Sequence, residues 1–210
     1  MRSTLLYPGN EKLGKKVWSW SLPNGTCKFC PGMSEVCKRV CYVSRYTRRY
    51  HIDYAPNYEA TRVSDFIGLM AKECVERGLI RIHVSGDFYC PDYVHKWIRI
   101  VKSCPGTTFY AYSRSWRVPR IKEALLELKS LPNMRLLWSC DKDTGMAPDG
   151  ECVWLAEDDS DDPPAPVKIV FRNKRSSFKY KQGGSWVCPH ENGTPGPSQV
   201  TCGKCQLCIK

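Results

Sequence analysis

The chain has 210 residues, of which 42% are hydrophobic and 25% are charged, a composition that excludes collagen-like, low-complexity and disordered proteins. No stretch is long and apolar enough for a signal peptide or a membrane-spanning helix, so we expect a cytoplasmic protein with no membrane partner. The net charge of +11 predicts a polyanionic partner, DNA or RNA, with a generally basic enzyme as the alternative.

Hydrophobic periodicity predicts strands and helices that alternate along most of the chain. The expected strands are 17–22, 79–84, 107–112, 134–139 and 167–171, and the expected helices cover 57–77, the segment that begins at Pro91, and 119–130. This alternation is typical of a parallel sheet with right-handed crossovers. Because about 250 residues are typical of a full eightfold barrel, we expect an α/β fold built as a partial (β/α) barrel.

The division into domains follows composition. We expect an α/β domain over residues 1–180, which carries a Cys-rich loop at 27–41 and an acidic, Pro-rich surface loop at 157–166. Residues 181–210 then form a small Cys-rich metal-binding module, too short to fold without a bound ion. Residues 141–162 hold nine acids and one base, so the remainder of the chain carries a charge of +19.

The thirteen cysteines cannot all pair internally, and without an export signal metal ligation is favoured over disulfides. The first group is CKFCPGMSEVCKRVC, which supplies Cys27, Cys30, Cys37 and Cys41. Thiolates bind zinc or an iron–sulfur cluster. Structural zinc would use all four, whereas a catalytic four-iron cluster needs only three, and Cys27 is then the one to omit. The iron–sulfur interpretation is favoured over zinc.

A second group of cysteines lies near the C-terminus, where the run CGKCQLC places three thiols at two-residue gaps. Zinc or a second iron–sulfur centre would both suit this spacing, with His190 close by in sequence. The predicted ligands of this group are Cys188, Cys202, Cys205 and Cys208. The other cysteines are expected to serve packing.

Polar residues follow several of the predicted strands, and the carboxyl ends of parallel strands are where ligands bind. We therefore expect Asp87, Asp141 and Arg114 to be catalytic, as acids, bases, nucleophiles or anion binders. The residues expected to contact a cofactor are Ser85, Gly86, Tyr112 and Ser139. The alternatives are that each Asp caps a helix or forms a turn, and that His83 is an interior residue rather than a base.

Basic and aromatic residues alternate in RYTRRYHIDY (45–54), which offers phosphate contacts together with rings for base stacking. A second basic tract follows the last predicted strand. The candidate nucleic-acid contacts are Arg45, Arg48, Arg49, Arg117, Lys174 and Arg175, although such charges could equally form a solvated face.

Four segments resemble the gene product 88 family of phages and plasmids, whose function is mostly unassigned. They are CPGMSEVCKRVCY (30–42), RIHVSGDFYCPDYVHKWIRIV (81–101), FYAYSRSWRVP (109–119) and CGKCQLC (202–208). The resemblance covers most of the chain. It implies a phage or mobile-element protein made in a bacterial host cytoplasm.

A more distant resemblance is to radical S-adenosylmethionine barrels, which carry a Cys loop after the first strand. Cys37 and Cys41 match the first pair of their Cys-x3-Cys-x2-Cys motif, and Ser44 stands in the third place. We expect an iron–sulfur or zinc enzyme that modifies nucleic acid, with S-adenosylmethionine as an open question. The alternatives are a transglycosylase that exchanges a base through an Asp nucleophile and structural zinc, and a non-catalytic module that binds nucleic acid or a host protein.

Overall fold

A seven-stranded sheet organises the computed structural model, which describes residues 4–148, 150–173, 178–192 and 200–210. The strands follow one another across the sheet in the order β1-β2-β3-β4-β5-β6-β7. All neighbouring pairs are parallel except β1 with β2. Their bounds are β1 (Tyr7–Pro8), β2 (Trp18–Trp20), β3 (Leu79–Ile82), β4 (Thr108–Ser113), β5 (Met134–Cys140), β6 (Cys152–Ala156) and β7 (Ile169–Arg172).

The predicted class, α/β with a mostly parallel sheet, is confirmed, whereas the predicted barrel is not. Each strand lies beside the one that precedes it, as right-handed crossovers between neighbours produce. Within the described residues, β1 and β7 are the edges of the sheet and do not pair with each other. The sheet of the described residues is therefore open.

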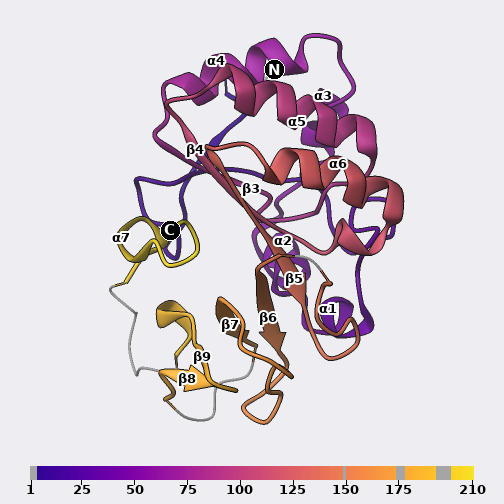
Figure 1. Ribbon diagram of the computed structural model, residues 1–210. Helices are drawn as coiled ribbons and strands as arrows, with labels where there is room; N and C mark the ends of the chain where they lie inside the picture. The colour runs from indigo at the N-terminus through magenta and orange to yellow at the C-terminus, as the bar shows by residue number, and fades with distance from the viewer. Residues whose placement is uncertain (1–3, 149, 174–177, 193–199) are drawn as a thin grey trace.

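Three helices cover one face of this sheet and lie side by side in the upper part of Figure 1. They are α4 (Phe66–Val75), α5 (Pro91–Ser103) and α6 (Pro119–Lys129). Proline occupies the first turn of both α5 and α6, where a missing N–H costs nothing. Between these helices and the strands lies the main core, which contains the fully buried Trp20, Trp97 and Trp138.

The opposite face of the sheet is covered by the two ends of the described chain. Leu13 and Val17 pack on Tyr110, and Cys188 packs on Leu137 and other apolar side chains of the sheet. The tail contains the short pair β8 (Lys181–Gln182) and β9 (Ser185–Trp186), the turn η2 (Pro189–Glu191) and α7 (Cys202–Cys205). Figure 1 shows α7 and the C-terminus well away from α4, α5 and α6.

The predicted helix over 57–77 is wrong in extent, because the chain forms two helices there. These are α3 (Ala55–Ala60) and α4, separated by turns. The Asn57 amide donates to the carbonyl of Ser21 at 2.7 Å, and Phe66 packs against the ring of Trp20. Two short helices satisfy both contacts, and Val63, which lies inside the predicted helix, is 51% exposed in the turn between them.

The remaining segments differ in smaller ways. Strand β6 was not predicted, because its apolar run lies inside the acidic stretch. The Cys-rich loop contains α1 (Glu35–Arg39), and α2 (Tyr42–Tyr50) follows directly. The short helix η1 (Ser115–Arg117) follows β4. No helix in the described parts of the chain is long and apolar enough to cross a membrane.

Candidate functional site

The Cys-rich loop lies on the carboxyl ends of β3 and β4, the end of the sheet at which the candidate catalytic residues were expected. The backbone N–H of Asp87 donates to the carbonyl of Phe29 at 2.9 Å. Gly32 passes so close to β4 that a Cβ atom there would lie 1.9 Å from the carbonyl oxygen of Arg114, so only glycine fits. Arg117, which follows β4, donates to the carbonyls of Gly32 and Met33 at 3.0 and 3.2 Å.

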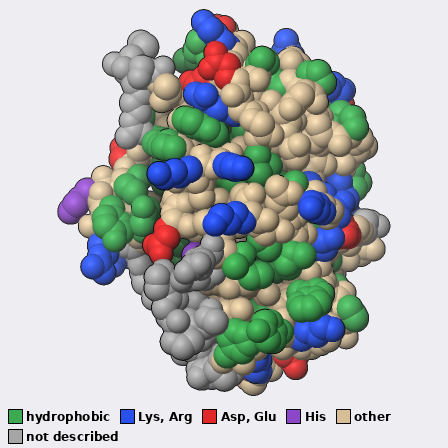
Figure 2. All heavy atoms as spheres, turned by 90° about the vertical axis from the view of Figure 1, so that its left-hand side faces the viewer, with side chains coloured by type: hydrophobic (Ala, Val, Ile, Leu, Met, Phe, Trp, Pro, Cys, Tyr) green, Lys and Arg blue, Asp and Glu red, His purple; other side chains and the backbone are tan. Residues whose placement is uncertain are grey.

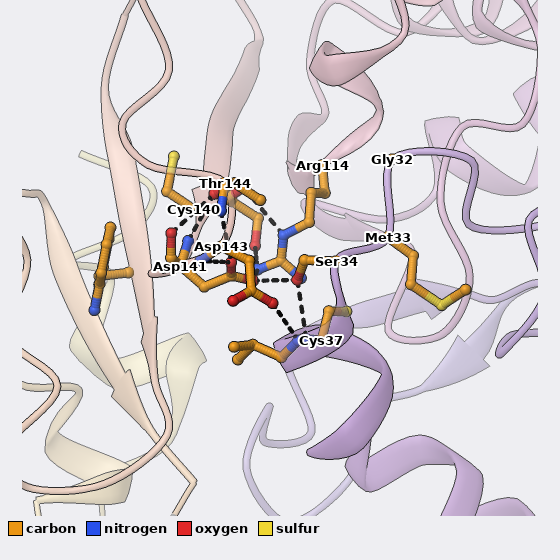
Figure 3. A network of polar contacts seen from close by, with 12 residues as sticks. Gly32, Met33, Ser34, Cys37, Arg114, Cys140, Asp141, Asp143 and Thr144 are labelled. Carbon is orange, nitrogen blue, oxygen red and sulfur yellow. Dashed lines mark hydrogen bonds and ion pairs between the residues drawn. The ribbon is translucent and has the colours of Figure 1, made fainter.

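A buried polar network joins the same loop to β5 (Figure 3). The hydroxyl of Ser34 donates to Oδ2 of Asp141 at 2.5 Å, and Nη2 of Arg114 lies 3.1 Å from that oxygen. Asp141 is fully buried, and only 6% of the Arg114 side chain is exposed. The other Asp141 oxygen accepts from the backbone N–H groups of Asp143 and Thr144. This carboxylate is therefore bonded on both oxygens.

The network also fixes the first helix of the loop. Ser34 is the N-cap of α1, and its oxygen accepts from the backbone N–H of Cys37 at 3.0 Å. A carboxylate oxygen of Asp143 accepts from the backbone N–H of Val36 at 2.7 Å. Both are free N–H groups of a helix N-terminus, which oxygen acceptors stabilise. The position of Cys37 is thus set by side chains of two distant segments.

A more exposed contact holds the far end of α1. Glu157, which follows β6, pairs with Arg39 and with Lys142, each at 2.5 Å. Hydrogen bonds to these two cations lower the pKa of Glu157 to about 2.

The carboxylate of Asp87 is buried and holds the turn after β4. It accepts from the hydroxyl of Ser113 at 2.7 Å and from the backbone N–H groups of Phe88, Arg114 and Ser115. Burial raises the pKa of Asp87, and these hydrogen bonds act in the opposite direction. Asp87 is not the helix cap considered from sequence, since the N-cap of α5 is Cys90. The geometry gives it a positioning role.

The residues predicted to contact a cofactor do not lie together. The hydroxyl of Ser139 accepts from Arg114 at 2.9 Å, which places it in the network. Gly86 has a φ of +75°, and its close neighbours are Leu22 and Pro23 of the chain itself. Ser85 is buried, and within the described chain its hydroxyl has no hydrogen-bond partner. Tyr112 faces the other side of the sheet, toward the C-terminal tail.

His83 is an interior residue, the alternative that sequence favoured over a base. It lies just after β3 with a φ of +63° and is 3% exposed. Its Nε2 lies 2.9 Å from the hydroxyl of Tyr93. Burial, together with the nearby cation of Arg81, lowers the pKa of His83 to about 3, so the ring is neutral at physiological pH.

The pKa values of two loop thiols are raised by burial and by neighbouring thiols. Burial raises the pKa of Cys30 to about 12, and Asp87, Cys37 and Cys41 act in the same direction. Burial also raises the pKa of Cys37, against the opposing effect of Arg114. Cys27 is exposed. Burial therefore disfavours the thiolate forms of Cys30 and Cys37 when no cation is bound beside them.

The four predicted tail ligands line one hollow against the second face of the sheet. Burial raises the pKa of Cys188 to about 12 and that of Cys208 to about 11, and neighbouring thiols add to both shifts. Tyr112 and Ile169 form the wall on the sheet side. The other thiols of this hollow are Cys202 and Cys205, and His190 lies at its edge.

Thiols at both places are the donor type that zinc and iron–sulfur clusters require. In the residues that the structure describes, no three His, Cys, Asp or Glu side chains are arranged to hold a metal ion. The chain thus brings the predicted ligands into two neighbourhoods without forming either coordination shell. Metal binding stays a prediction at both, with the loop and the tail as separate candidate sites.

The predicted nucleic-acid contacts are dispersed. Arg48 and Arg49 are exposed on α2, and Arg45 belongs to the same helix. Arg117 contributes at least one of its N–H groups to fixing the loop. Lys174 and Arg175 lie outside the described residues. On the side of the molecule that carries α7, Figure 2 shows many Lys and Arg side chains and fewer acidic ones.

The fold and this site define a class: a mostly parallel α/β protein with a Cys-rich loop fixed to the ends of its strands. The family model described as Gene product 88 matches residues 4–210, so the chain belongs to that family. It is 27% identical over 212 residues to the Gene 88 protein of Mycobacterium phage L5, covering 91% of this chain and 82% of that protein. It is 28% identical over 141 residues to the Gene 88 protein of Mycobacterium phage D29, covering 60% and 57%.

No solved structure matches the chain. The resemblance to the gene product 88 family is thus confirmed, and the comparisons give no support to the more distant resemblance to radical S-adenosylmethionine barrels.

The residues that fix the Cys-rich loop on the sheet were not predicted from sequence, above all Ser34, Asp143 and Gly32. One signal was available, because Ser34 precedes a short helical segment in the way an N-cap does. The tight approach of Gly32 to β4 had no sequence signal beyond the Pro31-Gly32 pair, which is equally typical of an ordinary turn.

Proposed function

We propose that this protein is a phage enzyme that modifies DNA or RNA at a metal centre held by Cys30, Cys37 and Cys41. The observation that carries the proposal is the buried contact of Ser34 with Asp141 and Arg114, which fixes the Cys loop to the ends of β4 and β5. Ligands bind at this end of parallel sheets. A loop needed only for folding would not require a buried ion pair beneath it, because such pairs contribute little net stability.

The donor set suits an iron–sulfur cluster better than a closed zinc site. Cys37 and Cys41 both raise the pKa of Cys30, which indicates that the three thiols lie near one another, whereas Cys27 is exposed. Three thiolates on a four-iron cluster leave one iron open to a cofactor or to the reacting group, and S-adenosylmethionine is a candidate for that position. Arg114 lies close enough to Cys37 to favour its thiolate.

The transglycosylase alternative is less well supported by the geometry. That reaction needs a carboxylate free to attack a sugar carbon. Asp87 accepts four hydrogen bonds, and Asp141 is bonded on both oxygens and fully buried. Both therefore act in this proposal as positioning residues, with Arg114 between them.

The first test is metal and sulfide analysis of protein purified without oxygen, together with an absorption spectrum. We expect iron and acid-labile sulfide, and a broad visible band that Cys37→Ala removes. Cys90→Ala is the matched control, since Cys90 is similarly half-buried but lies at the start of α5. A colourless protein that contains only zinc would overturn the iron–sulfur assignment.

The second test concerns activity. DNA and RNA from cells that express the protein are digested, and their nucleosides are compared by mass spectrometry with those from cells expressing Cys37→Ala. We expect an altered nucleoside that depends on Cys37. If the compositions are identical while the protein still binds nucleic acid, the protein is the non-catalytic binding module instead.

A further inference from the structure

A second cavity lies next to the Cys loop and takes no part in the network described above. It has a volume of about 240 Å³ and opens to solvent. Its walls come from β1 and β2, from α2, and from the segment after β3. Helix α2 begins directly after Cys41, so one end of the cavity adjoins a predicted metal ligand.

The walls of this cavity combine aromatic rings with serine hydroxyl groups. Four tyrosines line it, namely Tyr7, Tyr42, Tyr46 and Tyr54. Ser19 and Ser21 also line it and are 6% and 3% exposed. Both residues face a cavity that opens to solvent, so their hydroxyls can bond to a bound molecule.

The cavity is neutral, although one of the helices that line it is basic in sequence. The described residues that line it are all uncharged. Helix α2, however, has the sequence YVSRYTRRY, with three arginines and no acid. Tyr42, Tyr46 and Tyr50 follow one another at four-residue steps on this helix and are 53%, 43% and 56% exposed. Aromatic side chains on a helix are more often buried than exposed to this extent.

We propose that this cavity binds one base of a single-stranded nucleic acid, whose phosphates contact α2. This inference rests on the proposed function and names how the substrate is held. A neutral aromatic cavity suits a base, because every base offers a flat face for stacking and edge groups that bond to hydroxyls. Cations outside the cavity suit the phosphates. The cavity would hold the selected base beside the Cys loop.

The test uses fluorescein-labelled oligothymidylate of about eight nucleotides and an abasic backbone of the same length, with binding followed by fluorescence anisotropy. Wild-type protein should bind the oligothymidylate at least about tenfold more tightly than the abasic backbone. Tyr46→Ala should remove most of that difference, and Tyr46→Phe should keep it, since the ring remains. Tyr180→Ala is the matched control, because Tyr180 is an exposed tyrosine outside the cavity.

The outcomes separate this inference from the proposed function. Equal binding of the two polymers, or no effect of Tyr46→Ala, would contradict binding of a base in the cavity. Nucleic-acid binding by the protein would remain supported. Binding of thymidine monophosphate without binding of the oligomer would show that the occupant is a free nucleotide. It would contradict our inference that the occupant belongs to a polymer. Failure of every probe to bind would overturn the proposed function, and the cavity with it. A thermal melt of each variant verifies folding.

Discussion

The two cysteine groups lie on one sheet in opposite surroundings. The loop is held by polar contacts, with the Ser34, Asp141 and Arg114 network beneath it. The tail is held by apolar packing and by backbone hydrogen bonds, in which Cys202 and Gly203 donate to the carbonyls of Lys12 and Leu13. Polar contacts fix direction, whereas apolar packing chiefly contributes stability. In our proposal the loop carries the chemistry and the tail serves folding.

The largest expected effect separates the two groups by stability. Cys202→Ser should lower the melting temperature by about 10 °C, since the predicted metal ion would stabilise a tail of this size. Cys37→Ser should change it much less while removing metal from the loop. Differential scanning calorimetry and metal analysis of both variants provide the measurement. Equal destabilisation by the two substitutions would contradict the division of roles.

The next effect tests the polar network. Asp141→Asn should lower the free energy of unfolding by about 3 kcal/mol, because it leaves the guanidinium of Arg114 buried without its charge partner. Glu127→Gln, which breaks an exposed pair with Lys102, should cost less than about 1 kcal/mol. Urea unfolding measures both. The double variant Arg114→Gln/Asp141→Asn should lose less than the two single losses combined; simple additivity would show that the pair is not coupled.

A smaller effect tests the close approach of the loop to β4. Gly32→Ala should lower the free energy of unfolding by about 2 kcal/mol, because a methyl group would clash with the carbonyl of Arg114. It should also lower the metal content of the loop. Gly106→Ala is the control, since a Cβ there meets nothing within 4 Å. Urea unfolding and metal analysis check both variants. Normal stability and metal binding in Gly32→Ala would show that the loop moves freely on the sheet.

The smallest effect is a pH dependence of the exposed contact at the end of α1. The pKa of Glu157 is about 2 in the folded protein and about 4.3 in an unfolded chain. A lowered folded pKa contributes stability above the unfolded value, and this contribution is lost as pH falls from about 5 toward 2. Glu157→Gln should therefore flatten the stability curve in that range. Parallel curves for both proteins would contradict the assignment.

The alternating part of the fold could be predicted from sequence because periodicity and proline placement agree there. Strands β3, β4 and β5 and helix α6 lie within one or two residues of their predicted bounds, and α5 begins at the predicted Pro91. Strand β6 was missed because its five residues stand among acids, so composition concealed a buried strand. The barrel could not be decided, since sequential parallel strands are common to open and closed sheets.

The site could be predicted only in outline. Asp87, Arg114 and Asp141 were found because they follow strands, and the structure brings them to one end of the sheet. Their roles were not predictable, since whether a carboxylate is free or fully bonded depends on donors from distant segments. Tyr112 was misplaced because alternate residues near a strand end face opposite sides, and sequence does not show which side the loop covers.

The backbone contacts of the tail have a consequence for synthesis of the protein. Cys202 and Cys208 help to cover a sheet face built from residues that leave the ribosome much earlier. Until residue 208 has emerged, Leu137, Val153 and Ile169 lack part of their cover, and such apolar surface favours association with other chains. The sheet face is thus completed only after residue 208 has emerged. Supply of the predicted metal ion would then affect how much of the chain reaches the native state.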